Sequence, residues 1–167
     1  MGLDIRSASP GELRTIKKLL TRESAGRLEY VYCVRNKHTD KLFYAWMDKN
    51  GYSEHDIHYL FHGSRNENWY GLMTSGPLLM PKGVVITGKA FGNGIYFANR
   101  AKKSIGYTSL KDACWTDGRS DTGFIAIYKV LFKNPKHVNR YGNYSLRGIR
   151  PHDAVFAHRG LDLKNDE

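Results

Sequence analysis

The sequence predicts a single α+β domain, and three observations lead to this conclusion. Its 167 residues are enough for one domain with a core, and 41% hydrophobic and 13% aromatic content excludes a disordered chain. Segments with helical periodicity and short strand-like runs follow one another. Neither an internal repeat nor a linker interrupts them, so 1–167 is taken as one domain, with 1–27 as an N-terminal lead-in containing one helix.

Composition and charge limit the possible function classes. No apolar run approaches the ~20 residues of a membrane span, and the first ten residues lack the apolar core of a secretion signal. Cys33 and Cys114 are more consistent with free thiols than with a disulfide. We therefore expect a soluble intracellular protein, cytoplasmic or, in a eukaryote, nuclear, with no membrane partner. The net charge of +10 would attract dinucleotides or nucleic acid, but fits a merely solubilising surface equally well.

The first predicted helix spans Ser9–Ser24. Ser9 can cap it, Pro10 suits the first helical position, and Glu12 can complete a capping box. Apolar residues then recur at helical spacing, at Leu13, Ile16, Leu19 and Leu20. Gly26 can end this segment.

The next segments alternate between strand-like and turn-like patterns. Residues 28–35 alternate as a half-buried strand does, and 36–40 have turn composition. The short apolar run 42–47 fits either a helix or a strand. The run 57–61 predicts a buried strand that ends at His62-Gly63.

A second helix is predicted after this strand. Ser64 and Glu67 have the spacing of a capping box, and the helix should stop at Gly76. Residues 77–90 are expected to form a loop. A short strand over 95–98 follows the glycines of Gly92-Asn93-Gly94.

The remaining chain contains a third helix and further strands. Asn99 can cap a helix that reaches about Tyr107, and 124–130 is the clearest strand pattern in the sequence. After Lys133 a loop region is expected, followed by a short apolar patch at 154–157.

Three segments combine polar or aromatic side chains with glycines at the ends of these elements: 62–65, 91–98 and 103–107. Glycine lets a ligand approach the backbone because it has no Cβ. Ser104 and Tyr107 are three residues apart, so on a helix they would share a face. A ring that stacks and a hydroxyl that hydrogen-bonds would together fit a flat aromatic amide.

In this order and spacing the three segments resemble the catalytic domain of the poly(ADP-ribose) polymerase family, which has a diphtheria-toxin-like fold and a His-Tyr-Glu triad. The resemblance runs from about residue 59 to 133 and continues more loosely to the end. A lone Gly-x-Gly such as Gly92-Asn93-Gly94 would not identify the family, because the third glycine of a Rossmann fingerprint is missing. The resemblance implies an ADP-ribosyltransferase fold with split, mostly antiparallel sheets and short flanking helices.

The resemblance also implies that the chain binds NAD⁺ as a consumed substrate. Gly63 would hold the nicotinamide amide through its backbone, and Ser104 would hydrogen-bond the same amide. Tyr107 would stack on the nicotinamide ring, and Tyr96 would line the other side of the pocket.

Other residues would contact the rest of the dinucleotide. His62 would hydrogen-bond a ribose hydroxyl, and Ser64 would reach the adenosine half. The loop 77–90 corresponds to the family's donor-site loop, and loops after Lys133 include the region that faces the acceptor.

The resemblance implies a catalytic triad of His62, Tyr96 and Glu167. Glu167 matches the glutamate that begins the family's last strand, but here it is the final residue, so the C-terminal end is expected to be truncated and the last strand missing. Asp153, before the apolar patch, is the alternative carboxylate.

Other functions remain open at this stage. The expected reaction is transfer of ADP-ribose, singly or as a chain, to a protein acceptor, to the enzyme itself or to nucleic acid attracted by the basic surface. The alternative is a module of the same fold that binds NAD⁺ or ADP-ribose without transfer. A zinc site at His55, His58 and His62 would need a helix where a strand is predicted, so no metal is expected.

Overall fold

The structure is a computed structural model that describes residues 2–77, 90–108, 122–144 and 150–158. It contains short strands and helices, which alternate irregularly along the chain. In chain order the elements are β1 (Leu3–Ser7), α1 (Pro10–Leu19), α2 (Arg22–Gly26), β2 (Tyr32–Asn36), α3 (Lys37–Lys49), η1 (Glu54–Asp56), β3 (Ile57–Gly63), η2 (Asn66–Asn68), α4 (Trp69–Ser75), α5 (Ala101–Ile105), β4 (Ile125–Leu131), β5 (Pro135–Val138) and β6 (Ala154–Ala157).

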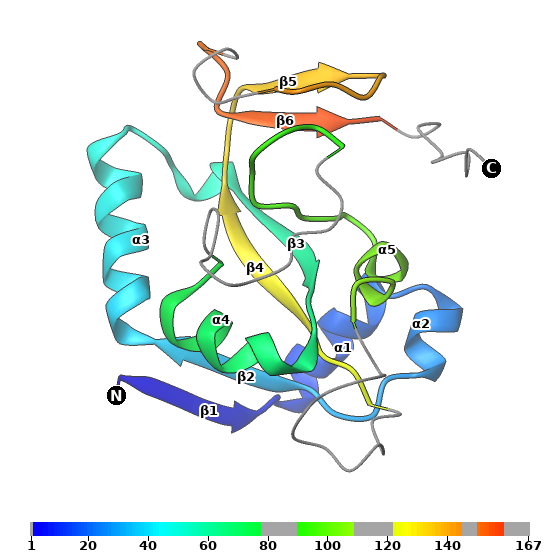
Figure 1. Cartoon of the computed structure of the whole chain (residues 1–167). Coiled ribbons are helices and arrows are strands. Elements are labelled where there is room, and N and C mark those ends of the chain that lie inside the picture. Colours follow the sequence, from blue (N-terminus) through cyan, green and yellow to red (C-terminus); the bar gives the residue numbers. More distant parts are fainter. Residues whose placement is uncertain (1, 78–89, 109–121, 145–149, 159–167) are drawn as a thin grey trace, which may run out of the picture.

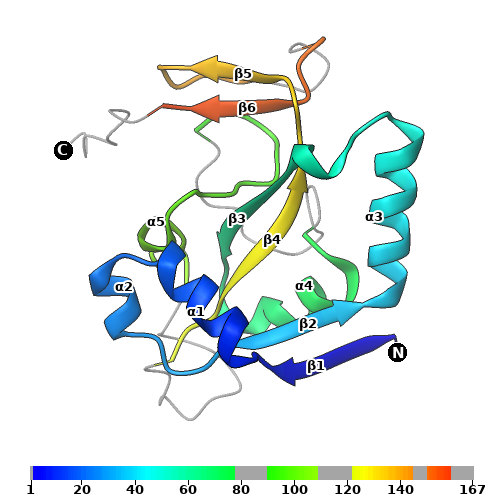
Figure 2. The same cartoon turned by 180° about the vertical axis from the view of Figure 1, so that it is seen from behind.

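The centre of the molecule is the antiparallel pair β3–β4, in register from Ile57↔Leu131 to Gly63↔Ile125 (Figure 1). The antiparallel pair β1–β2 lies toward one end of it, and the parallel pair β5–β6 lies beyond the other end. Helix α3 and helix α5 stand on opposite sides of the central pair in both views (Figure 2). The predicted mixture of helices with small, mostly antiparallel sheets is confirmed for the described residues.

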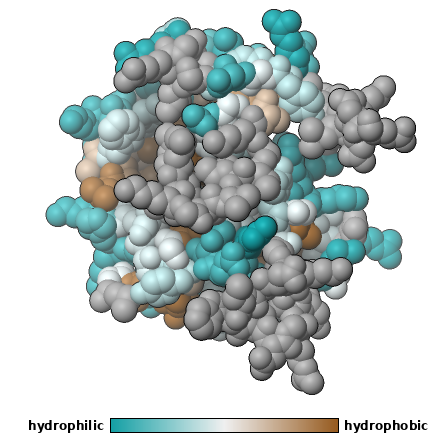
Figure 3. Space-filling model, viewed as in Figure 1, coloured by the Kyte–Doolittle hydropathy of each residue, from teal (hydrophilic) through white to brown (hydrophobic). Residues whose placement is uncertain are grey.

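The core is small, and its buried apolar side chains come one each from α3, β3, α4, α5 and β5. Among the described residues the buried apolar side chains are Met47, Phe61, Trp69, Ala101 and Val138. On the face in Figure 3, small apolar areas lie among mostly hydrophilic side chains. In the described part of the chain no helix combines the length and apolarity required to span a membrane.

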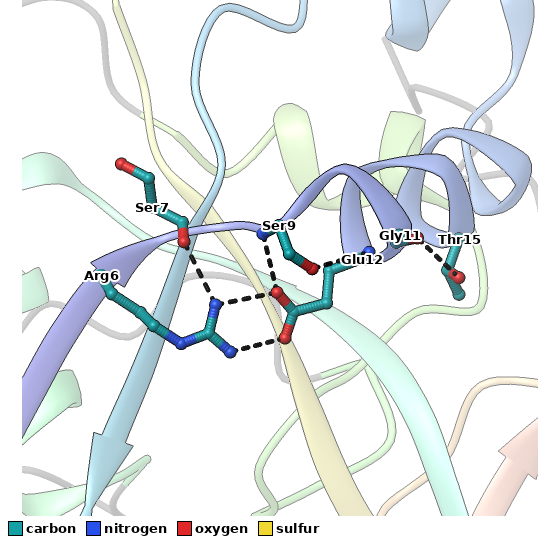
Figure 4. A network of polar contacts seen from close by, with 6 residues as sticks. All are labelled: Arg6, Ser7, Ser9, Gly11, Glu12 and Thr15. Atoms are coloured by element: carbon teal, nitrogen blue, oxygen red, sulfur yellow. Dashed lines mark hydrogen bonds and ion pairs between the residues drawn. The ribbon is translucent and has the colours of Figure 1, made fainter.

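Helix α1 begins as its sequence predicts. The Ser9 hydroxyl accepts a hydrogen bond from the Glu12 N–H at 3.3 Å, and the Glu12 carboxylate accepts one from the Ser9 N–H at 2.8 Å. Arg6, from β1, adds a two-pronged ion pair to the same carboxylate, with N–O distances of 2.8 and 2.7 Å (Figure 4). This pair ties the first strand to the first helix.

The prediction of one continuous N-terminal helix is wrong. The backbone becomes extended at Leu20, with φ −88° and ψ 148°, which ends the helix. The Thr21 hydroxyl then caps a separate helix, α2. Strand β1 was not predicted, because its five residues pair only with a partner almost 30 positions later. That partner, β2, is confirmed but starts at Tyr32 rather than at residue 28.

The predicted turn over 36–40 is a helix start. Asn36 is common in turns, but its side-chain oxygen accepts hydrogen bonds from the N–H groups of His38 and Thr39, at 3.0 and 3.4 Å. It therefore caps α3, and the ambiguous apolar run 42–47 lies inside that helix.

Strands β3 and β4 match their predictions to within two residues. The prediction of a capping box between Ser64 and Glu67 is wrong. The Ser64 hydroxyl instead accepts a hydrogen bond from the Asn68 side chain at 2.9 Å, and a 3₁₀ turn precedes α4. The helix ends at Gly76 as predicted, where φ is +73° and a residue without Cβ is favoured.

The later elements are partly confirmed. Helix α5 is shorter than predicted, because it is preceded by Arg100 rather than Asn99 and ends at Ile105. The predicted strand 95–98 reduces to a single bridge between Phe61 and Ala98. Strand β6 confirms the apolar patch at 154–157, but its partner β5 lies where a loop was expected.

The ion pair at the start of α1 gives a testable pH dependence. Hydrogen bonds from Arg6 and then Ser9 hold the pKa of the Glu12 carboxyl far below its ordinary value of 4.5. A depressed folded-state pKa stabilises the fold above the unfolded-state pKa, and this contribution is lost as pH falls through the folded-state pKa. We expect Glu12→Gln to lower Tm by a few degrees at pH 7, with the deficit shrinking below about pH 4.

Thermal unfolding by circular dichroism from pH 7 to pH 3 measures this difference. The control is Glu67→Gln, because Glu67 lies 3.8 Å from Arg65 in an exposed pair of little expected worth. A Tm deficit for Glu12→Gln that stays constant across this range would refute the linkage.

Candidate functional site

The end of β3 and helix α5 meet at Gly63 and Ser104. A Cβ added to Gly63 would overlap the Ser104 carbonyl oxygen and lie 2.7 Å from the carbonyl carbon. Only glycine fits this position, since real Cβ atoms do not come that close to a backbone. The two residues predicted to hold the same amide are therefore adjacent, and Ser104 is only 3% exposed.

His62, one residue earlier, is half-buried and anchored by one ring nitrogen. Its Nδ1 lies 2.9 Å from the Tyr96 carbonyl oxygen. Because a carbonyl can only accept, Nδ1 carries the proton in this contact. In the neutral ring Nε2 is then an acceptor, which suits a hydroxyl donor of a ligand.

Tyr96 is fixed by the turn that precedes it. Its hydroxyl donates to the Gly92 carbonyl at 2.7 Å and accepts from the Phe91 N–H at 3.1 Å. Gly92 has φ +92°, and a Cβ there would lie 3.1 Å from the Tyr144 nitrogen. The phenol of Tyr96 thus closes the turn over Gly92-Asn93-Gly94, while the carbonyl of Tyr96 orients His62.

The two remaining predicted binding residues lie at the border of this group. The Tyr107 N–H donates to the Ser104 carbonyl at 3.1 Å, in a turn that continues directly from helix α5. Tyr107 is 47% exposed, so part of this residue is accessible to a ligand. Ser64 directly follows Gly63, and its hydroxyl is taken up by Asn68.

Asp153, the alternative carboxylate, has a structural role. It accepts hydrogen bonds from the Tyr52 hydroxyl and from the N–H groups of Lys133 and Asn134, at 2.8–3.0 Å. Burial raises its pKa, but these hydrogen bonds outweigh burial, and the pKa is lowered.

Asp153 also lies at the wrong end of the central pair. Lys133 and Asn134 follow the end of β4 that pairs with Ile57, five strand residues, or about 17 Å, from His62. Glu167 lies outside the described residues, as do residues 78–89 of the expected donor loop.

The three histidines considered for zinc do not converge. His58 and His62 lie in a strand, as predicted, and His58 contacts the Phe132 carbonyl at 3.0 Å while His62 contacts Tyr96. Within the described ranges no three His, Cys, Asp or Glu side chains are grouped to hold a metal ion.

Sequence reasoning missed two aromatic neighbours of His62. Phe97 and Tyr128 pack on its imidazole, with ring centroids 5.7 and 6.0 Å away. Tyr128 was predicted only as a strand residue. The sequence carries no signal for this contact until the register of β3 against β4 is known.

Comparison with known proteins identifies the family that this chain matches. The model for the poly(ADP-ribose) polymerase catalytic domain matches residues 12–136. Human poly [ADP-ribose] polymerase 2 is 33% identical over 118 residues, covering 62% of this chain and 19% of that protein. Chicken poly [ADP-ribose] polymerase 1 is 32% identical over 103 residues, covering 57% and 10%. The maize polymerase 2 is 42% identical over 55 residues, covering 33% and 8%. The chain thus spans less than a fifth of each of these relatives.

The packing of Gly63 predicts a strong effect of the smallest substitution. We expect Gly63→Ala to lower the free energy of unfolding by about 1–3 kcal/mol, because β3 and α5 must separate to admit the methyl group. Urea denaturation measures this change. The matched control is Gly71→Ala in α4, where a Cβ meets nothing within 4 Å and helix propensity favours alanine. Equal stability of the two variants would contradict the close approach.

Proposed function

The chain belongs to the poly(ADP-ribose) polymerase family through its catalytic domain, and from this premise we propose that it binds NAD⁺ and transfers ADP-ribose to an acceptor. The observation that carries the proposal is the contact of Gly63 with Ser104 beside the anchored imidazole of His62. These residues come from β3 and α5, which are far apart in the sequence. Membership of the family supports an ADP-ribosyltransferase fold formed by residues 1–167 as one catalytic domain.

The nicotinamide half of NAD⁺ would bind at the junction of β3 and α5. A primary amide offers two donors and one acceptor, which match the backbone of Gly63 and the hydroxyl of Ser104. The half-exposed ring of Tyr107 would stack on the nicotinamide, with Tyr96 on the opposite side. The absence of a side chain at Gly63 lets the Ser104 backbone lie against the strand, which would place the Gly63 backbone and the Ser104 hydroxyl near the same amide.

The adjoining ribose would be held by His62. With its Nδ1 proton donated to the Tyr96 carbonyl, the neutral ring has Nε2 free of a proton and able to accept from a ribose hydroxyl. Tyr96 thereby acts twice, through its carbonyl on His62 and through its ring beside the nicotinamide. Ser64 would contact the adenosine half, provided that its hydroxyl turns from Asn68.

The reaction breaks the bond between nicotinamide nitrogen and ribose C1′, and the electron pair goes to the departing ring, which leaves as a neutral molecule. Positive charge develops on the sugar, as in glycoside cleavage. A nearby carboxylate stabilises this charge and can accept the proton of the acceptor hydroxyl as its oxygen bonds to C1′. Glu167 is the proposed carboxylate, because the contacts of Asp153 are structural.

The acceptor and the cellular setting complete the proposal. We propose a protein acceptor, the enzyme included, with nucleic acid as an alternative drawn by the net charge of +10. NAD⁺ is the consumed substrate, and the proposed reaction needs no metal. The proposed location is the cytoplasm, or the nucleus in a eukaryote.

Incubation with radiolabelled NAD⁺ tests the transfer. We expect labelled protein from the wild type, a loss of at least about 100-fold for Glu167→Gln, and activity within about threefold of wild type for Asp153→Asn. The size of the labelled product distinguishes a single unit from a chain. Tyr107→Ala should weaken NAD⁺ binding about tenfold, through loss of stacking.

Other outcomes of this experiment would overturn different parts of the proposal. Label retained by Glu167→Gln but lost by a folded Asp153→Asn would reverse the assignment of the carboxylate. Measurable NAD⁺ binding without transfer to any acceptor would favour the non-catalytic binding module. Absence of NAD⁺ binding by the folded wild type would refute the proposed function.

A further inference from the structure

The rings of His62, Phe97 and Tyr128 form a closed triangle. The imidazole lies 5.7 Å from the ring of Phe97 and 6.0 Å from that of Tyr128, and these two rings are 6.0 Å apart. The planes of His62 and Tyr128 are almost perpendicular, at 82°. Such edge-to-face contacts are attractive and depend on the orientation of the ring.

The register of the central strands creates the contact with Tyr128. His62 pairs with Ala126 and Leu60 pairs with Tyr128, so His62 and Tyr128 are diagonal neighbours on one face. Diagonal partners in an antiparallel pair are within reach of aromatic side chains. Phe97 completes the triangle because the bridge between Phe61 and Ala98 fixes the segment that carries it.

Tyr128 itself is held firmly and stays neutral. Burial raises the pKa of its phenol to about 12, so the ring carries no charge at physiological pH. Its hydroxyl points to the Leu72 carbonyl of α4 at 3.5 Å, at the long end of the hydrogen-bond range. The ring, more than the hydroxyl, is therefore the part that acts on His62.

We propose that Tyr128, together with Phe97, is a positioning residue that fixes the orientation of His62 for NAD⁺. A single hydrogen bond from Nδ1 to the Tyr96 carbonyl leaves the imidazole able to tilt about that bond. The two aromatic contacts restrict this tilt and hold Nε2 in one direction. The inference rests on the proposed function, since it assumes that Nε2 meets a ribose hydroxyl.

A double-mutant cycle separates positioning from general packing. Binding of carba-NAD⁺, which resists cleavage at the ribose, is measured by calorimetry. The proteins are wild type, Tyr128→Leu, His62→Ala and the double variant. We expect Tyr128→Leu to weaken binding about five- to tenfold in the wild type, but less than about twofold when His62 is already absent. Tyr128→Phe should bind within about twofold of wild type, because it keeps the ring.

Tyr59→Leu is the matched control. Tyr59 is also a strand tyrosine of the central pair, but it faces Lys129 in the register and is 59% exposed, so binding should not change. An equal loss for Tyr128→Leu with and without His62, or no loss in either case, would overturn the inference. Thermal unfolding confirms that each variant is folded at the temperature of measurement.

A second readout does not depend on NAD⁺. In ¹⁵N-labelled protein, with the His62 signal identified by its loss in His62→Ala, the wild type should have its ring proton on Nδ1. The NOEs from the His62 ring protons to the ring of Phe97 should weaken in Tyr128→Leu, whereas in Tyr128→Phe they should stay as in the wild type. If the wild type binds no carba-NAD⁺, the proposed function fails, yet this spectrum still decides the positioning. Unchanged NOEs between His62 and Phe97 in Tyr128→Leu would refute it.

Discussion

The proposed site depends on one close approach, in which the last residue of β3 touches the backbone of α5 without a side chain between them. Gly63 can lie against Ser104 because strand and helix are each fixed elsewhere. The strand is held by seven register pairs with β4 and by the bridge to Ala98. Helix α5 places Ala101 and Ser104 in the buried interior. Backbone geometry, rather than a network of side chains, therefore defines where a ligand amide would sit.

Polar side chains join elements of the fold away from His62, whereas main-chain carbonyls anchor the residues near it. Arg6 and Glu12 tie β1 to α1, and Asp153 ties the loop after β4 to Tyr52, all away from His62. Near the site the anchors are main-chain carbonyls: that of Tyr96 receives His62, and that of Ser104 receives the N–H of Tyr107. Because a carbonyl has a fixed polarity, it determines which nitrogen of His62 carries the proton and leaves the other to a ligand.

The sequence was informative where local chemistry decides the structure. The capping box at Ser9 and the continuous apolar strands β3 and β4 could be predicted, since each depends on neighbouring residues. Strands β1 and β5 could not, because each is a short polar segment that is stable only with a distant partner. Asn36 misled the prediction because one side chain suits both turns and helix caps.

The same distinction applies to the site residues. The motif residues are local in sequence and could be named, but their grouping depends on the register of β3 with β4 and on the position of α5. Tyr128 illustrates this, because its relation to His62 exists only across two strands.

Basic residues near the site can be identified from the sequence alone. Arg65 follows the glycine motif, and Lys102 and Lys103 precede Ser104, all with exposed side chains. Under the proposed function, these charges would attract an anionic dinucleotide over the range of about 8 Å that physiological salt leaves effective, although Arg65 also lies 3.8 Å from the carboxylate of Glu67. In the proposed function, attraction by this charge and binding of the amide between Gly63 and Ser104 would be separate steps, and only the second would require the close approach at Gly63.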